Sequence, residues 1–203
     1  MQEIFEKYSA LLQTNPLFHN IAPSDIPIML THLQATVKTY HKEEYVKSTG
    51  DKMDFIALVL TGKVHVLQDD YYGNRSITAS ISAGSLFAEA FACAGVSFLP
   101  VDIVAAEDCT VMYLNSNTLF HACDGSCQFH HIIIQNLLGI VARKNITLNQ
   151  KLKYTSRKTT GEKLLAYLND QAKAKQSNEF TIPFNRQELA DYLGVERSAM
   201  SAE

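Results

Sequence analysis

Long apolar runs are missing from this chain. No segment approaches the roughly 18 consecutive apolar residues of a membrane-spanning helix, and the N-terminus lacks the basic-then-apolar order of a signal peptide. The composition, 46% hydrophobic and 19% charged over 203 residues, is ordinary for a globular protein. We therefore expect a cytoplasmic protein with one medium and one small domain and no membrane partner.

Cysteines are few, and catalytic motifs are absent. Four cysteines do not suffice for a disulfide framework in a chain of this length. There is no G-x-S-x-G, P-loop or dinucleotide-binding glycine motif. A metal-dependent cupin would need several His and carboxylate ligands on facing strands, and His65 has no such partner nearby in the sequence. We expect neither an enzyme nor a metal site.

Positive charge is scarce in the first part of the chain, and the overall net charge is −3. Residues 1–142 contain 7 Lys and Arg against 14 Asp and Glu, whereas residues 143–203 contain 11 against 7. The two parts therefore carry −7 and +4. This asymmetry is typical of an acidic sensor joined to a module that faces phosphate groups, with a chance distribution over solvated helix faces as the alternative.

Short strand-like segments fill the region from about residue 35 to residue 114. They are rich in Val, Ile, Thr, Tyr and Phe, and turn residues rather than long helices separate them. Residues 55–60 and 63–67 flank Thr61-Gly62, which predicts a tight hairpin. Further strands are predicted over residues 75–81, 101–106 and 110–114. The pattern indicates an α+β chain whose sheet region is an antiparallel sandwich or barrel.

A long helix is predicted over residues 126–154, which contain no proline and one glycine. Within it, spacings of four and three alternate along one set of positions: Ile134, Leu138, Val141, Asn145, Leu148 and Leu152. A small barrel cannot cover so long an apolar stripe, so we expect a parallel homodimer along this seam, with Asn145 fixing its register. Packing of the helix on its own barrel is the alternative.

Residues 185–203 fit a helix-turn-helix, preceded by a helix over residues 157–175 and a short strand over residues 179–183. Asn185 and Glu188 form a capping box, and Gly194 stands where the first helix must end in a left-handed residue. The second helix is expected to begin near residue 196, with Ala199 and Met200 inside. A generic helical hairpin is the alternative reading.

In such motifs the second helix enters the DNA major groove. We expect Arg197, Ser198 and Ser201 to contact base edges, because an arginine can bridge the two acceptors of guanine. Arg186 and Gln187, at the start of the first helix, suit phosphate contacts that position the protein without specifying a sequence.

Six segments resemble the Crp/Fnr family of transcription regulators: residues 17–26 (LFHNIAPSDI), 60–64 (LTGKV), 84–89 (GSLFAE), 104–111 (VAAEDCTV), 160–165 (TGEKLL) and 185–190 (NRQELA). The resemblance covers essentially the whole chain. It implies a cyclic-nucleotide-binding-type β-roll (a jelly roll, or double-stranded β-helix) over residues 1–125. A dimerisation helix over residues 126–154 and a winged helix-turn-helix over residues 155–203 would follow.

The resemblance also implies binding partners and a longer C-terminal domain. Palindromic double-stranded DNA and RNA polymerase are the expected partners, and activation is commoner than repression in the family. Family members continue through the rest of the recognition helix and a β wing. Since the sequence stops at Glu203, we expect a truncated form with weak DNA affinity.

The sensor departs from the pattern of cyclic-AMP-binding members. Glu89 occupies the position of the ribose-binding glutamate, but Ala88 replaces the preceding glycine, and Leu99-Pro100 replace the Arg-Ser pair that binds the phosphate. Burying a phosphate without a cation is costly, so we expect no response to cyclic AMP and no cofactor. The effector is unknown: it is an apolar molecule, or the sensor has none. If one binds, we expect its pocket to be lined by Phe87, Glu89, Phe98, Leu99, Thr147 and Leu148.

Other classes of function stay open at this stage. The β-roll could serve as an interaction module that answers a redox, metal or haem signal. Cys123 and Cys127, spaced C-x-x-x-C at a helix entry, are the redox candidates. His19, His32 and His41 are haem candidates without a supporting motif.

Overall fold

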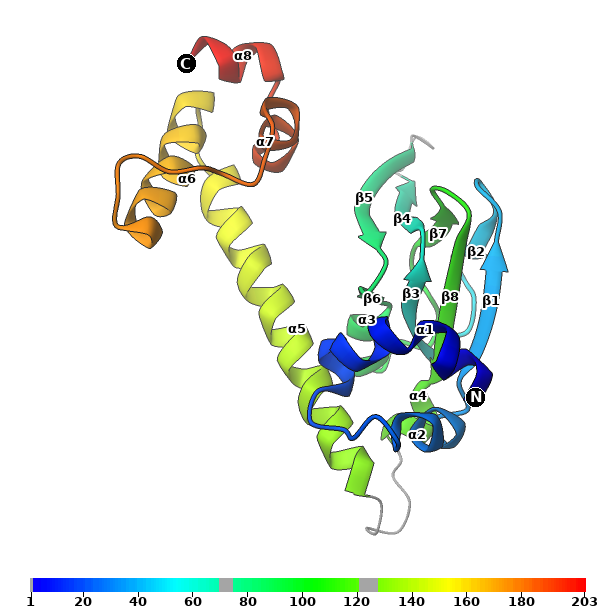
Figure 1. Cartoon of the computed structure of the whole chain (residues 1–203). Helices are drawn as coiled ribbons and strands as arrows, with labels where there is room; N and C mark the ends of the chain where they lie inside the picture. The colour runs from blue at the N-terminus through cyan, green and yellow to red at the C-terminus, as the bar shows by residue number, and fades with distance from the viewer. Residues whose placement is uncertain (1, 70–74, 121–127) are drawn as a thin grey trace. The chain divides into compact units, whose positions relative to one another are not determined.

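The computed structural model describes residues 2–69, 75–120 and 128–203, and the chain divides after residue 141 into two compact units (Figure 1). The division falls inside the longest helix, α5 (Gln128–Thr155). Among the described residues, no helix is both long and apolar enough to cross a membrane.

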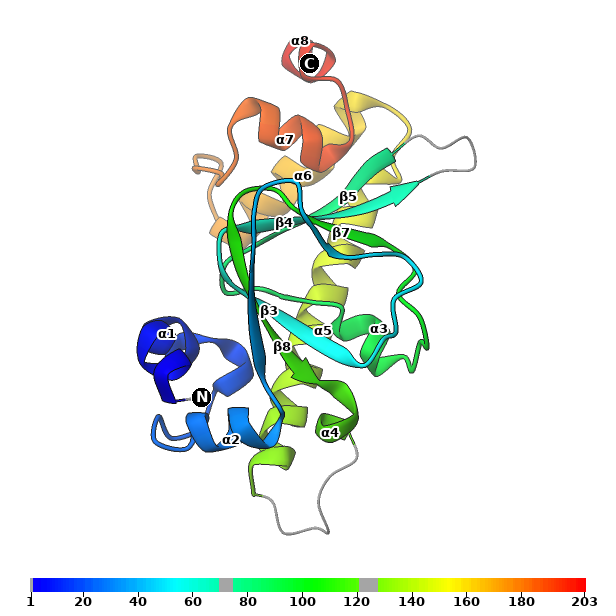
Figure 2. The same cartoon turned by 90° about the vertical axis from the view of Figure 1, so that its right-hand side faces the viewer.

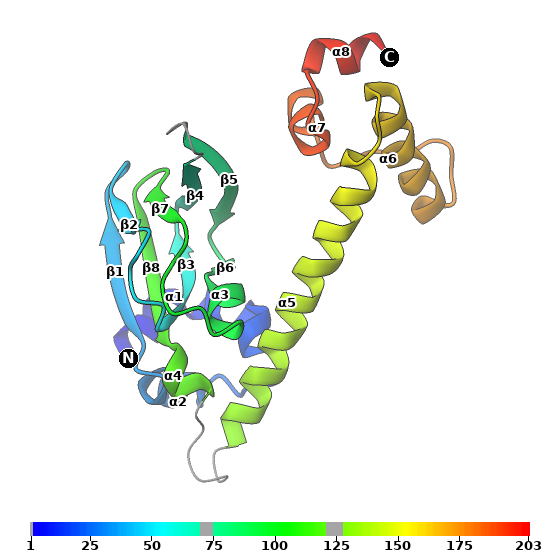
Figure 3. The same ribbon diagram turned by 180° about the vertical axis from the view of Figure 1, so that it is seen from behind.

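The first unit contains two four-stranded antiparallel sheets, with strand orders β1-β8-β3-β6 and β2-β7-β4-β5. Figure 3 shows β1 and β2 at one edge of this sandwich and β5 and β6 at the other. The strands are β1 Thr36–Tyr40, β2 Tyr45–Lys47, β3 Phe55–Thr61, β4 Lys63–Asp69, β5 Arg75–Ser82, β6 Leu86–Phe87, β7 Asp102–Ala105 and β8 Cys109–Asn115. The predicted α+β class with an antiparallel sandwich is confirmed.

The predicted hairpin at Thr61-Gly62 is wrong in its pairing. A tight turn does join β3 to β4, and Gly62 has a φ of 74°. However, β3 pairs with β6 and β8, whereas β4 pairs with β5 and β7, so the turn carries the chain from one sheet to the other. Local turn residues predict a reversal of direction but do not determine which strands pair.

Strand β3 is apolar throughout because both of its faces are covered. Since side chains alternate along a strand, Ala57 and Val59 point into the core between the sheets, and Ile56 and Leu58 point to the other side. That second side packs under α1 (Gln2–Thr14), η1 (Pro16–Phe18), α2 (Ile26–His32), α4 (Ser116–Phe120) and the first turns of α5. Figure 2 shows α1, α2 and α4 gathered at one end of the sandwich.

The first turns of α5 are tied to this unit by packing and by hydrogen bonds. Ile133 and Leu137 are buried in the core beneath the N-terminal helices. The Asn136 amide donates to the carbonyl oxygens of Leu17 and His19, at 2.9 and 2.7 Å. The first unit therefore buries one side of α5.

The second unit contains the end of α5 and three further helices: α6 Thr160–Lys175, α7 Arg186–Leu193 and α8 Arg197–Ala202. Its core comprises Tyr154, Tyr167, Leu189, Ala190, Leu193 and Met200. The strand predicted over residues 179–183 is absent, since residues 142–203, all of them described, offer no other strand to pair with it. Ala199, predicted to lie inside, is exposed.

Candidate DNA-binding and effector sites

The helix-turn-helix is held by the local contacts that its sequence predicts. The Glu188 amide donates to Asn185 Oδ1 at 2.9 Å, and the Asn185 amide donates to Glu188 Oε2 at 2.8 Å, which completes the capping box. Gly194 ends α7 in the left-handed region with a φ of 62°. The Val195 amide then donates to the Ala190 carbonyl at 3.0 Å, so the chain turns directly into α8.

The residues predicted to contact DNA are all exposed. Arg186 and Gln187 lie in the first turn of α7, and Arg197, Ser198 and Ser201 lie on α8. The opposite side of both helices is buried through Ala190, which is fully buried, and its neighbours Leu189, Leu193 and Met200.

The two arginines are available for an anionic partner, whereas the glutamine is partly engaged. Among the described residues neither Arg186 nor Arg197 forms an ion pair. The Gln187 amide donates to Asp191 Oδ1 at 2.9 Å, so only part of its hydrogen-bonding capacity faces outward.

A polar and aromatic cluster joins the end of α5 to α6. Asp170 accepts hydrogen bonds from Lys153 at 2.5 Å and from the Tyr154 hydroxyl at 3.0 Å. These contacts hold the pKa of Asp170 below its ordinary value, with the Lys153 hydrogen bond the largest cause. Burial, followed by the bond to Asp170, raises the pKa of Tyr154 to about 12. The cluster fixes α6 on α5 and thereby supports the helices packed on α6.

The predicted dimer seam is exposed in the single chain except at Val141, which is half-buried. The exposed fractions are 38% for Ile134, 68% for Leu138 and 60% for both Leu148 and Leu152. Asn145 is exposed as well, and its side-chain oxygen accepts a hydrogen bond from the Asn149 amide at 2.7 Å. By their helical spacing these residues follow a different side of α5 from Ile133 and Leu137, which the first unit buries.

Within the first unit, Phe87, Glu89, Phe98 and Leu99 do not line one cavity. Phe87 and Leu99 are buried core residues between the sheets, and Glu89 is buried at the start of α3 (Glu89–Cys93). Phe98 is 63% exposed and lines a separate groove of about 580 Å³. Thr147 and Leu148 are exposed positions of α5 within the second unit.

Ala88, the residue predicted to replace a glycine of cyclic-AMP-binding members, has a backbone conformation typical of glycine. Ala88 has a φ of 63°, in the left-handed region that favours glycine. The Leu99 side chain, predicted to replace the phosphate-binding arginine, is 1% exposed and fills space between the sheets. This interior is thus packed with apolar groups and offers no cation there.

The described cysteines lack the properties of reactive thiols. Burial raises the pKa of both Cys93 and Cys109, and nearby carboxylates raise it further, so the thiolate is disfavoured. Cys123 and Cys127 lie outside the described residues.

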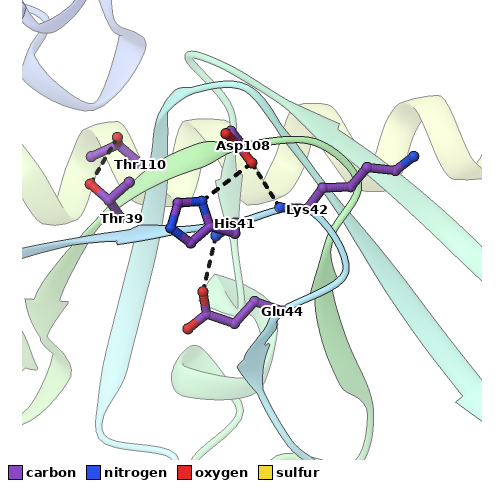
Figure 4. A network of polar contacts seen from close by, with 6 residues as sticks. All are labelled: Thr39, His41, Lys42, Glu44, Asp108 and Thr110. Carbon is purple, nitrogen blue, oxygen red and sulfur yellow. Dashed lines mark hydrogen bonds and ion pairs between the residues drawn. The ribbon is translucent and has the colours of Figure 1, made fainter.

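The histidines proposed as haem candidates have structural contacts. His41 lies in an exposed turn where its amide donates to Glu44 and its ring faces Asp108 at 3.7 Å (Figure 4). Asp108 also accepts from the Lys42 amide, which ties the β1–β2 and β7–β8 turns together. His32 contacts the His130 ring edge to face. The described part of the chain contains no group of three or more potential metal ligands.

One further groove was not predicted. It measures about 760 Å³ and lies where β1 and β2 form the edge of the sandwich. Its lining comes from residues between positions 34 and 115, so no local spacing in the sequence could have revealed it.

Comparisons with known proteins agree with the fold. Residues 37–126 match the cyclic nucleotide-binding domain family. The transcriptional activator protein FnrL of Cereibacter sphaeroides is 26% identical over 175 residues, which cover 82% of this chain and 67% of that protein. The first unit is therefore a domain of the cyclic nucleotide-binding type.

Two solved structures share this fold along most of the chain. The Thermus thermophilus catabolite activator protein superposes with a TM-score of 0.53 at 20% identity, covering 92% of this chain and 84% of that one. FixK2 from Bradyrhizobium japonicum gives 0.54 at 20% identity, with coverages of 83% and 81%. The chain is therefore similar to transcription regulators of the Crp/Fnr type, in line with the resemblance seen in its sequence.

Proposed function

We propose that this chain acts as a cytoplasmic homodimer that binds palindromic double-stranded DNA and controls transcription without responding to cyclic AMP. The observation that carries the proposal is the capped helix-turn-helix whose second helix exposes Arg197, Ser198 and Ser201 while Met200 packs inward. FnrL, to which the chain is similar, is a transcriptional activator, which supports a function on DNA and argues against catalysis.

Roles on DNA are assigned to individual side chains. Arg197 reads a guanine through its two acceptor atoms, assisted by Ser198 and Ser201. Arg186 and Gln187 contact phosphates near the start of α7, where the helix N-terminus also favours an anion. An activating role is suggested by the name of the relative FnrL, and contact with RNA polymerase is part of the same proposal.

The test begins with selection of binding sites from a pool of random duplexes, because the amino-acid sequence does not reveal which DNA sequence is bound. We expect a two-fold palindrome to be enriched. Arg197→Ala should then weaken binding to the selected site by about 1–3 kcal/mol and leave binding to scrambled DNA nearly unchanged. Arg186→Ala, the matched control, should weaken both to a similar extent. Equal loss on both duplexes for Arg197→Ala would remove its base-reading role, and no enrichment would favour an interaction module.

The lack of a cyclic AMP response rests on the filled interior of the first unit. Leu99 and Phe87 occupy the space between the sheets, and no Lys or Arg stands between Ser76 and Ile103. Calorimetric titration of the purified protein with cyclic AMP should therefore give no binding heat. Saturable binding would show that another cation serves the phosphate and that the sensor is a nucleotide switch.

A further inference from the structure

The groove at the β1/β2 edge lies at the opposite side of the sandwich from β6 and α3, the elements that flank Ala88 and Glu89. β1 and β2 are the terminal strands of their two sheets, and β5 and β6, next to α3, are the terminal strands at the opposite edge (Figure 3). The groove measures about 760 Å³ and is bounded by β1, β2, β8 and the first residue of β3. It is large enough for a small organic molecule.

Two lysines line this groove without an acidic partner. The Lys38 ammonium lies 4.5 Å from the centre of the Tyr40 ring. The Lys47 ammonium lies 4.6 Å from the centre of the Phe55 ring and 5.6 Å from that of Tyr113. Neither lysine side chain forms an ion pair or hydrogen bond among the described residues. Ring faces attract these cations but leave their N–H groups available to an acceptor.

A pair of phenol groups offers one more donor. The Tyr40 and Tyr113 hydroxyls lie 2.7 Å apart, and this mutual hydrogen bond uses one of the two hydroxyl hydrogens. The other O–H has no acceptor among the described residues, although Tyr40 is only 2% exposed. Burial and the bond to Tyr40 raise the pKa of Tyr113, so the pair keeps both hydrogens near neutral pH. Such a buried donor is expected to find a partner.

Two carboxylates limit the charge of an acceptable ligand. Asp54 is paired with Lys52 at 3.6 Å, whereas the Asp51 carboxylate accepts a hydrogen bond from the Ser48 amide at 3.0 Å. The groove lining holds two lysines and two aspartates, and Lys52, which lies outside the lining, neutralises Asp54, so one net positive charge is left to face a ligand. A monoanion balances this charge, whereas a phosphate dianion would exceed it.

We propose that this groove binds a small organic monocarboxylate with a flat apolar body. The carboxylate accepts hydrogen bonds from Lys38, Lys47 and the free phenol O–H, and the body packs on the rings of Phe55 and Tyr113. The site lies at the opposite edge of the sandwich from β5, β6 and α3. It would allow the sensor to bind a ligand other than a nucleotide. Ligand binding here does not depend on whether the chain binds DNA.

The test uses benzoate as the probe and the whole chain without DNA. Calorimetry should show one saturable site per chain, while benzamide, which keeps the ring but lacks the charge, binds at least about tenfold more weakly. Lys47→Met and Lys38→Met should each weaken benzoate binding about tenfold with unchanged circular dichroism. Lys42→Met, on the exposed β1–β2 turn, is the matched control and should bind as the parent does.

The location is checked by the ring signals of ¹³C-labelled tyrosine, assigned with Tyr40→Phe and Tyr113→Phe. Benzoate should shift the signals of these two rings more than those of the other tyrosines. No saturation by about 10 mM benzoate, equal affinity for benzamide, or unchanged binding in both lysine variants would each overturn the proposal.

Discussion

Gly62 shows how one residue decides the course of the chain between the two sheets. Its φ is 74°, and a Cβ built on it would lie 2.3 Å from the Asp108 carbonyl oxygen and 2.7 Å from Cys109 Cβ. Any side chain therefore meets both a strained backbone and the start of β8. The close approach explains why the turn between β3 and β4 can be so short.

Replacement of Gly62 by alanine should lower the free energy of unfolding by about 2–5 kcal/mol, the sum of left-handed strain and a forced backbone shift. Urea denaturation followed by circular dichroism measures the change. Gly50→Ala is the control, because Gly50 has a φ of 89° but nothing within 4 Å of the added atom. It should cost only about 1–2 kcal/mol. Similar losses at both positions would refute the steric argument.

Asp170 gives the second unit a predictable acid sensitivity. Its pKa is lowered in the folded chain by Lys153 and Tyr154, so its contribution to stability is complete above its ordinary pKa. The contribution is lost as the pH falls below about 4 and through the folded-state value. Urea midpoints measured between pH 6 and pH 3 should show a decline that Asp170→Asn reduces. Glu179→Gln, at an exposed carboxylate, should keep the parent's slope.

At the level of elements, α5 uses two different sides. One side buries Ile133 and Leu137 in the first unit, and another leaves Leu138 and Leu148 exposed. The expected reason for the exposed side is a second copy of the same helix, since alternating spacings of four and three with a polar Asn145 are typical of a two-stranded seam. The sandwich buries only the side of α5 that faces it.

A charge in this seam should separate the copies. Leu148→Glu places an unpaired carboxylate where two helices would meet, and we expect the dissociation constant of the dimer to rise at least about a hundredfold. Sedimentation equilibrium over a range of concentrations measures it. Gln150→Glu adds the same charge on another side of α5 and should leave the dimer intact. A parent chain that sediments as a monomer at all concentrations would contradict the seam itself.

The local patterns of the sequence predicted elements better than their partners. Strand alternation, the heptad spacing and the Asn185 capping box predicted the main strands, α5 and α7, because each depends on neighbours a few residues away. Strand pairing across Gly62 was mispredicted, and the groove of Lys38 and Lys47 was missed, because both depend on residues far apart in the sequence. The strand predicted over residues 179–183 was wrong for the same reason, because β propensity does not tell whether a second strand is present to pair with it.

At the scale of the whole molecule, the proposed homodimer would impose its two-fold symmetry on DNA. Two copies of α8 related by a two-fold axis would read two inverted half-sites, with centres about 34–36 Å apart for adjacent turns of the duplex. The spacing between half-sites then becomes as important as their sequence. A monomer that binds one half-site would be indifferent to that spacing.

The dependence of binding on half-site spacing distinguishes a dimer from a monomer. Inserting about five base pairs between the selected half-sites turns one of them to the opposite side of the duplex, so the dimer can engage only one half-site. We expect affinity for the altered site to fall at least about tenfold, to the level of a single half-site. Fluorescence anisotropy with the parent and with Leu148→Glu tests the point. The variant, lacking a stable dimer, should bind both duplexes equally and weakly; spacing-independent binding by the parent would mean that the chain reads DNA as a monomer.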